Sequence, residues 1–152
     1  MNTFSAEAFD FVRKMKPGYV VSVCADGLAN LSLKGTLTAF DEHHLIFADM
    51  ASSQALAQSK HAPVTVEVTD PFSRKGYRFR GKATSIPVKQ EAAAYIAFYE
   101  NWGLEQTASR VNHFVVIEVE SCEAFMASGF SWVTTETVRE SWKESFNNPW
   151  KF

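Results

Sequence analysis

The chain has 152 residues, of which 46% are hydrophobic and 21% charged. This composition is typical of a folded protein, and the length fits a single domain over residues 1–152. A net charge of -2 argues against a nucleic-acid binder, which would carry a larger basic excess. No segment approaches the ~20 apolar residues that cross a bilayer. The first 15 residues carry four charges and lack the apolar run of a signal peptide, so we expect a cytoplasmic protein with no membrane partner.

The first part of the chain predicts a helix followed by a β-hairpin. Ser5 can cap the helix, and Pro17-Gly18 ends it. Four apolar residues share one face of this helix, namely Ala8, Phe11, Val12 and Met15. Tyr19–Ala25 is rich in valine, which predicts a buried strand. Asp26-Gly27 predicts the hairpin turn, because glycine accepts the positive φ that such turns need.

The segment Asn30–Thr38 alternates strictly between polar and apolar residues. One side carries Asn30, Ser32, Lys34, Thr36 and Thr38, and the other carries Leu31, Leu33, Gly35 and Leu37. A period of two predicts one strand with a packed apolar face and a polar face.

The rest of the chain predicts more short strands and three further helices. Strands are expected at Leu45–Ala48, Val64–Thr69, Gly76–Ile86, Val111–Val119 and Glu123–Ala127, and helices at Ser52–Lys60, Pro87–Gly103 and Thr135–Phe146. Such an order favours a mainly β protein, an antiparallel β-barrel with peripheral helices. A β-sandwich is the alternative.

Several kinds of catalytic site are not expected. The sequence holds no glycine-rich phosphate loop and no G-x-S-x-G nucleophile motif. His43 and His44 are adjacent, so on a strand they would point to opposite faces and could not bind one metal ion together. We therefore predict neither a metal site nor an acyl-transfer triad.

The order of the middle segments carries a resemblance. The valine-rich strand and the Asp-Gly turn are followed by Asn30–Gly35, Leu45–Asp49, Ala62–Val66 and Arg74–Ala83. This order resembles the pyridoxamine 5'-phosphate oxidase-like, FMN-binding split-barrel family, most clearly over residues 9–90. The resemblance implies a six-stranded antiparallel split barrel that forms a homodimer, with FMN bound in each interface cleft.

The resemblance also implies which residues bind the cofactor. The polar strand face would approach the flavin ring and ribityl chain, Ala48–Met50 would flank the ring, and the helix start at Ser52 would meet the phosphate, as helix N-termini do. The implied cofactor-binding residues are Asn30, Ser32, Leu33, Lys34, Gly35, Thr36, Ala48, Asp49, Met50, Ser52, Ser53, Gln54 and Trp132. No catalytic acid or base is expected, because the flavin itself carries out the chemistry.

The source of positive charge for the phosphate is open. Many family members place Lys or Arg where this chain has Ser52, so the charge would come from Lys34, Arg78 or Arg80, or from a partner subunit. Arg78 and Arg80 could equally form an ion pair with Glu67 or Asp49. The chain also lacks the basic C-terminal signature of true pyridoxamine-phosphate oxidases, so that activity is not expected.

The expected function is FMN-dependent electron transfer from a reduced nicotinamide to a small acceptor, such as a nitro compound, a quinone or oxygen. The alternative is a non-catalytic protein that carries FMN, a deazaflavin or haem, with His113 or His61 as the haem ligand. A dimeric scaffold without a cofactor is a third reading.

Overall fold

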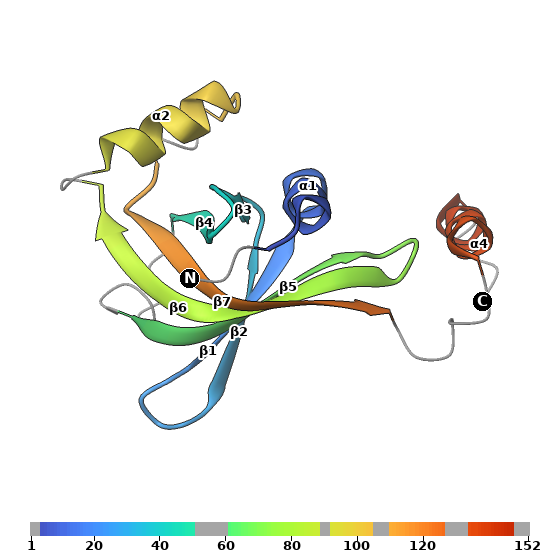
Figure 1. Ribbon diagram of the computed structural model, residues 1–152, viewed down its shortest axis with the longest axis horizontal. Coiled ribbons are helices and arrows are strands. Elements are labelled where there is room, and N and C mark those ends of the chain that lie inside the picture. The colour runs from blue at the N-terminus through green and yellow to red at the C-terminus, as the bar shows by residue number, and fades with distance from the viewer. Residues whose placement is uncertain (1–3, 51–60, 89–91, 105–109, 127–133, 148–152) are drawn as a thin grey trace.

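Seven strands form one antiparallel sheet in a computed structural model of the chain, which describes residues 4–50, 61–88, 92–104, 110–126 and 134–147 (Figure 1). The strands are β1 (Gly18–Val23), β2 (Ala29–Lys34), β3 (Thr38–Ala39), β4 (His44–Asp49), β5 (Ala62–Asp70), β6 (Lys75–Pro87) and β7 (His113–Met126). The helices are α1 (Ala6–Lys14), α2 (Ala93–Asn101) and α4 (Thr135–Asn147). This mainly β, antiparallel architecture is the barrel that the sequence pattern predicts and the split barrel that the resemblance implies, with seven strands instead of six.

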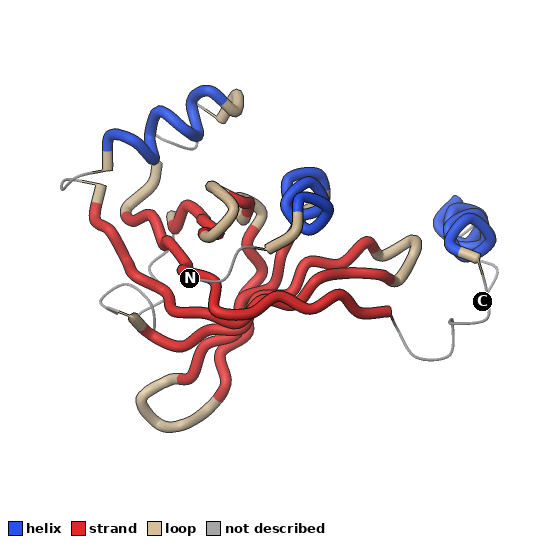
Figure 2. Tube along the Cα trace, in the orientation of Figure 1, coloured by secondary structure: helices blue, strands red, loops and turns tan. Residues whose placement is uncertain are grey.

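The sheet is curled so that its two edges approach each other. The strand order is β2-β1-β5-β6-β7-β4-β3, so the edge strands β2 and β3 are consecutive in the sequence. Residues 35–37 alone carry the chain from one edge to the other, which keeps the edges close (Figure 2). Among the described strands, β2 and β3 do not pair through their backbones. The barrel is therefore split between β2 and the β3–β4 pair.

The long strands β6 and β7 bend at a β-bulge between Arg80 and Gly81. A Cβ atom on Gly81 would lie 2.1 Å from the carbonyl oxygen of Glu118, so no other residue fits there without a shift of the backbone. Bulges increase the local bend and twist of a strand. β6 and β7 therefore stay paired on both sides of the bulge while their direction changes there.

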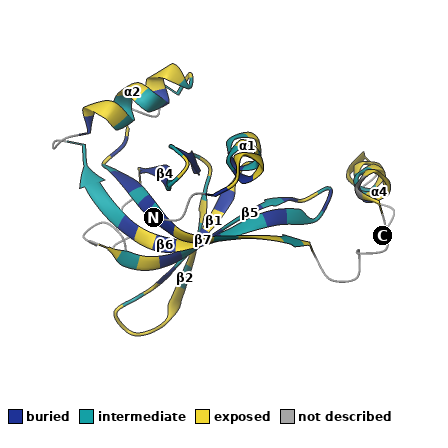
Figure 3. Cartoon of the chain, viewed as in Figure 1, coloured by how far each residue is buried: buried dark blue, intermediate teal, exposed yellow. Residues whose placement is uncertain are grey.

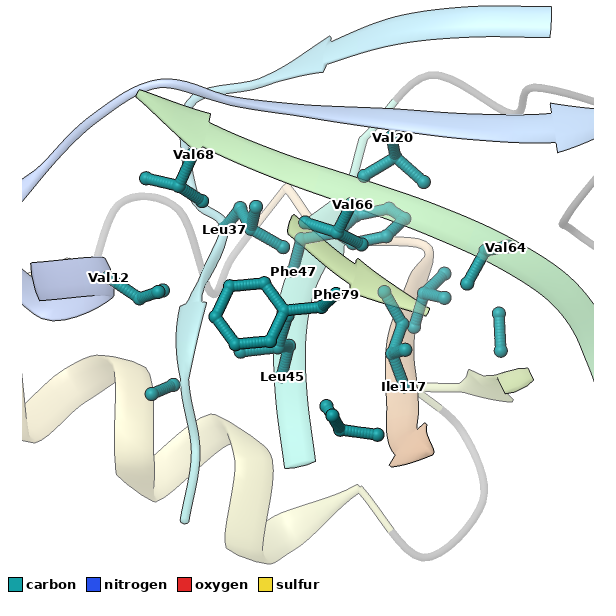
Figure 4. Close-up of a cluster of buried hydrophobic side chains, with 14 of the residues drawn as sticks. Val12, Val20, Leu37, Leu45, Phe47, Val64, Val66, Val68, Phe79 and Ile117 are labelled. Carbon is teal, nitrogen blue, oxygen red and sulfur yellow. The ribbon is translucent and has the colours of Figure 1, made fainter. Parts of the chain in front are cut away.

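The barrel interior is filled by aromatic and β-branched side chains. Figure 4 shows Phe79 lying among Leu45, Val66 and their neighbours, and Phe79 is fully buried. Helix α1 packs against this core with Ala8 and Val12, as its apolar face predicts, and the Ser5 hydroxyl caps it by accepting a bond from the Ala8 N–H. Burial of each large apolar side chain contributes about 1.5–3 kcal/mol, so this core supplies most of the fold's stability.

Among the described residues, the other two helices contribute nothing to this core cluster. A second buried cluster, centred on Tyr99 and Phe114, lies between α2 and the outer side of β4 and β7. Helix α4 lies near the tip of the β5–β6 hairpin (Figure 1). In the described part of the chain, no helix has both the length and the apolar character to cross a membrane.

Several predicted boundaries differ from the structure. Pro87 is the last residue of β6 and does not begin a helix, and α2 starts at Ala93. The two last predicted strands form one continuous strand, β7. The predicted helix at Ser52–Lys60 lies outside the described residues. The predicted Asp26-Gly27 turn is confirmed, with Gly27 at a φ of 82°.

The prediction for Asn30–Thr38 was wrong in two respects. The strand breaks after Lys34, because the chain must cross the split to reach β3. Within β2 the apolar face is not packed in the chain: Leu31 and Leu33 are 63% and 57% exposed, while Ser32 and Lys34 are half-buried. Leu37, which follows the break, is buried in the core as predicted. Figure 3 shows the exposed positions along β2.

Pairing with β1 explains this inversion. Ser32 is opposite Val20, which is fully buried, so the polar face of β2 is the one that turns inward. Leu31 and Leu33 are opposite Val21 and Tyr19, on the outer face of the sheet.

Candidate functional site

Side chains bridge the split in the barrel at Thr36. Its Oγ1 atom accepts a hydrogen bond from the Ala48 N–H at 3.0 Å and donates one to the Ala48 carbonyl at 3.1 Å. The hydroxyl thus replaces the backbone partner that a neighbouring strand would supply. It fixes the β2–β3 connection against β4.

Two opposite charges meet beside this bridge. Lys34 is the last residue of β2 and Asp49 the last residue of β4, and Lys34 Nζ lies 3.0 Å from Asp49 Oδ1. The side chain of Asp49 is 3% exposed and that of Lys34 is 12% exposed. Lys34 Nζ also lies 4.9 Å from the centre of the Phe47 ring. Each charge is stable in this buried position because the other is present.

Neighbouring elements hold this cluster in position. The hydroxyl of Tyr99 on α2 donates to the Thr36 carbonyl at 3.0 Å, and burial raises the pKa of this phenol, so it stays a protonated donor. Asn112 donates from its backbone N–H to the Asp49 carbonyl and from Nδ2 to the Met50 carbonyl, both at 3.0 Å. The end of β4 is thus fixed from two sides.

His113 lies next to this cluster, on the neighbouring strand β7. It pairs with Asp49 in the β4–β7 register, so the two side chains share a face of the sheet. Its Nδ1 atom is buried and has no hydrogen-bond partner in the part of the chain that the structure describes.

The structure brings four of the predicted cofactor-binding residues together, namely Lys34, Thr36, Ala48 and Asp49. Asn30 and Ser32 follow along the inward face of β2, and the Ser32 hydroxyl donates to the Val20 carbonyl at 3.4 Å. Leu33, Gly35 and Met50 are exposed at its edge. Ser52, Ser53, Gln54 and Trp132 lie outside the described residues.

The sequence did not point to Tyr99 or Asn112 as part of this cluster. Tyr99 lies on a helix among other aromatic residues, where it resembles an ordinary core residue. Asn112 precedes a strand and resembles a loop residue. Only the folded chain brings them to the end of β4.

Arg78 and Arg80 lie on the outer face of β6. Arg78 bonds Glu67 at 2.9 Å and Glu123 at 3.1 Å, while Arg80 lies 3.8 Å from Glu123. The alternative of a structural ion pair with Glu67 is therefore confirmed for Arg78.

The cluster at the split combines a charged donor and a charged acceptor with the exposed, apolar Met50 beside them. A site with few polar groups among apolar ones suits a flat heteroaromatic molecule with a polar edge. A flavin has that character, so the residues present fit this cofactor.

A family model described as Pyridoxamine 5'-phosphate oxidase matches residues 4–126. The chain belongs to this family. A search of curated proteins finds no match to the chain.

Several solved structures have the same fold as this chain, at low sequence identity. HupZ from Group A Streptococcus has a TM-score of 0.65 and 18% identity, over 82% of this chain and 95% of that one. An FMN-binding protein from Syntrophomonas wolfei has a TM-score of 0.60 and 11% identity, over 78% and 86% of the two chains. An F420 reductase has a TM-score of 0.57 and 14% identity, over 79% and 98%.

Proposed function

We propose that this family member binds FMN at the split in the barrel and passes electrons from a reduced nicotinamide to a small acceptor. The observation that carries the proposal is the buried Lys34–Asp49 pair, which joins the ends of β2 and β4 beside Thr36. A buried ion pair often contributes little to stability compared with apolar packing, which favours a binding role for this one. The FMN-binding protein with the same fold supports the choice of cofactor.

The residues divide by the part of the cofactor they would bind. Lys34 and Asp49 would meet the polar edge of the ring, Ala48 and Met50 would flank it, and Asn30, Ser32 and Thr36 would line the inward face. Leu33 and Gly35 would border this site, as would Trp132. When bound, the flavin supplies the redox chemistry, and the chain positions the ring and excludes water.

The phosphate would be bound without a lysine clamp from this part of the chain. Lys34 and Arg78 already pair with carboxylates. We therefore assign the phosphate to Ser52, Ser53 and Gln54, whose N–H and hydroxyl groups suit an anion if a helix begins there.

A homodimer would complete the site. Exposed apolar side chains gather on β1, β2 and their hairpin turn, and we call this surface the outer apolar face. Its members are Tyr19, Val23, Leu28, Leu31 and Leu33. Contiguous exposed apolar surface of this kind is typical of an interface, and a second copy of the same face would bury it in a two-fold arrangement.

A deazaflavin is the second candidate cofactor, favoured by the F420 reductase that shares the fold. Haem is a further alternative, favoured by the unpartnered, buried Nδ1 of His113. The third reading from sequence, a scaffold without a cofactor, would leave the Lys34–Asp49 pair without a binding role. A cytoplasmic location fits each of these candidates.

The cofactor can be identified on the purified full-length chain. We expect a yellow protein that releases FMN on heating and is bleached by NADH or NADPH without oxygen. A deazaflavin in the eluate would show that the cofactor is a deazaflavin, and a Soret band in the visible spectrum would show that it is haem. A colourless protein whose melting temperature does not rise with added FMN would overturn the proposal, because a ligand of the native state must stabilise it.

A further inference from the structure

The methionines of the described residues differ in their access to solvent. Met50 is 45% exposed and Met126 is 39% exposed, whereas Met15 packs against the barrel core. A thioether at the surface is open to oxidation, because the oxidant reaches its sulfur from solvent. Met50 and Met126 are therefore the accessible targets in the part of the chain that the structure describes.

Met50 lies just past the end of β4, where the two edges of the sheet meet. It follows Asp49, whose side chain is 3% exposed and paired with Lys34. The Met50 carbonyl accepts a hydrogen bond from Asn112 Nδ2 at 3.0 Å, so the backbone is fixed while the side chain stays in solvent. Beside a carboxylate that is closed off from solvent, Met50 thus offers an apolar surface that a ligand can reach.

Oxidation would change this surface from apolar to polar. Hydrogen peroxide transfers one oxygen atom to the thioether sulfur and leaves as water, so the sulfur is oxidised and the peroxide is reduced. The sulfoxide oxygen is a strong hydrogen-bond acceptor, and it must lose its water where the face of an aromatic ring covers it. When oxygen is the acceptor in the proposed function, its reduction by two electrons and two protons yields this peroxide.

We propose that Met50 is a redox-sensitive switch, whose oxidation to the sulfoxide in the cofactor-free protein lowers the affinity for the flavin. The inference rests on the proposed function, because it needs Met50 to flank the ring. It adds a means of regulation, which acts through one side chain. Methionine sulfoxide reductases reverse the oxidation, so the switch can be reset.

Protection by the cofactor tests the position of Met50 without any turnover. The full-length protein, freed of cofactor, is treated with hydrogen peroxide with and without saturating FMN, and peptide mass spectrometry measures the sulfoxide at each methionine. We expect FMN to slow the oxidation of Met50 at least about fivefold, because the ring covers its sulfur, and to leave Met126 unchanged. Met126 is the matched control, since its exposure is similar and it lies at the other end of β7 from His113.

The affinity for FMN after oxidation tests the switch itself. By quenching of flavin fluorescence, the oxidised natural chain should bind FMN at least about tenfold more weakly than the untreated chain, because a polar group is buried against the ring. Met50→Leu keeps an apolar side chain of similar size that cannot form a sulfoxide, so its affinity should change by about twofold or less. Met126→Leu should lose affinity as the natural chain does.

Two controls separate this effect from other oxidation. Cys24 and Cys122 are present in every variant, so an affinity lost through thiol oxidation would also be lost by Met50→Leu. Treatment with the methionine sulfoxide reductases for both epimers should restore the affinity of the oxidised natural chain.

The outcomes separate the two proposals. If FMN does not bind to the untreated chain, the proposed function is wrong and the inference falls with it. If FMN binds but does not protect Met50, the inference is wrong and the proposed function stands. The same conclusion follows if the oxidised natural chain keeps its affinity, or if Met50→Leu loses as much affinity as the natural chain.

Discussion

The hydroxyl of Thr36 forms hydrogen bonds with both backbone groups of Ala48, as acceptor from the N–H and as donor to the carbonyl. One side chain therefore acts as a strand partner where the sheet is open. Ala48 is buried, so without this hydroxyl its backbone groups on that side would lose their partner.

Replacing Thr36 by Val keeps the shape of the side chain and removes this bridge. We expect Thr36→Val to lower the free energy of unfolding by about 1–3 kcal/mol, because buried polar groups are left unsatisfied. Urea denaturation would measure the change. Thr36→Ser retains the hydroxyl and should lose less than half as much. Equal losses in the two variants would show that the hydroxyl is not the stabilising group.

The buried phenol of Tyr99 should make stability depend on alkaline pH. Burial raises its pKa above the ordinary value of 10.0. As the pH rises above 10.0, the unfolded chain releases this proton while the folded chain keeps it. The folded state then binds more protons, so stability falls with rising pH.

Tyr99→Phe removes both the ionisation and the hydrogen bond to the Thr36 carbonyl. At neutral pH we expect this variant to be about 1 kcal/mol less stable than the natural chain. The difference in stability between the two chains should shrink above the ordinary pKa of the phenol, because only the natural chain is destabilised by ionisation of this residue in the unfolded state. Denaturation measured between pH 8 and pH 11 tests this, and parallel profiles would contradict it.

The outer apolar face predicts the oligomeric state. We expect the natural chain to sediment as a dimer and Leu31→Lys to sediment as a folded monomer, because a charge at the centre of that face cannot be buried unpaired. The control is Phe146→Lys on α4, which changes a side chain of similar exposure, 62%, away from this face. A natural chain that is monomeric, or a Leu31→Lys variant that stays dimeric, would refute this interface.

Helix α4 is attached to the β5–β6 turn by a few identified contacts. The buried carboxylate of Asp70 accepts hydrogen bonds from the Ser73 hydroxyl and from Arg139 on α4, and Arg74 packs over Trp142. We expect Arg139→Ala to weaken this attachment by about 1 kcal/mol, since Arg139 is partly exposed.

Hydrogen exchange would show this as about fivefold faster exchange in α4, with unchanged protection in the barrel strands. Lys143→Ala, an exposed position on the same helix, is the control and should have little effect. Faster exchange throughout the barrel would mean that the contact supports the whole fold and not α4 alone.

The local patterns of the sequence predicted most elements correctly. The cap at Ser5, the Asp26-Gly27 turn and the C-terminal helix depend on a few neighbouring residues, and the structure has all three. The start of α2 was misplaced because Pro87 also fits the end of a strand, and only pairing with His113 keeps it in β6.

The predicted strand that begins at Asn30 shows what the sequence pattern determines and what only the tertiary structure decides. The period of two determined that polar and apolar residues lie on opposite faces of β2, because side chains alternate along any strand. It could not determine which face turns inward, since an apolar face can be buried by the same chain or by another molecule.

The tertiary structure decided that question through the buried Val20 opposite Ser32, and it broke the strand after Lys34. It also paired Lys34 with Asp49, fifteen positions along the chain, because the two edges of one curled sheet meet there. The spacing of residues along the sequence cannot predict such a pair. It exists because the whole sheet must close before the ends of β2 and β4 come together.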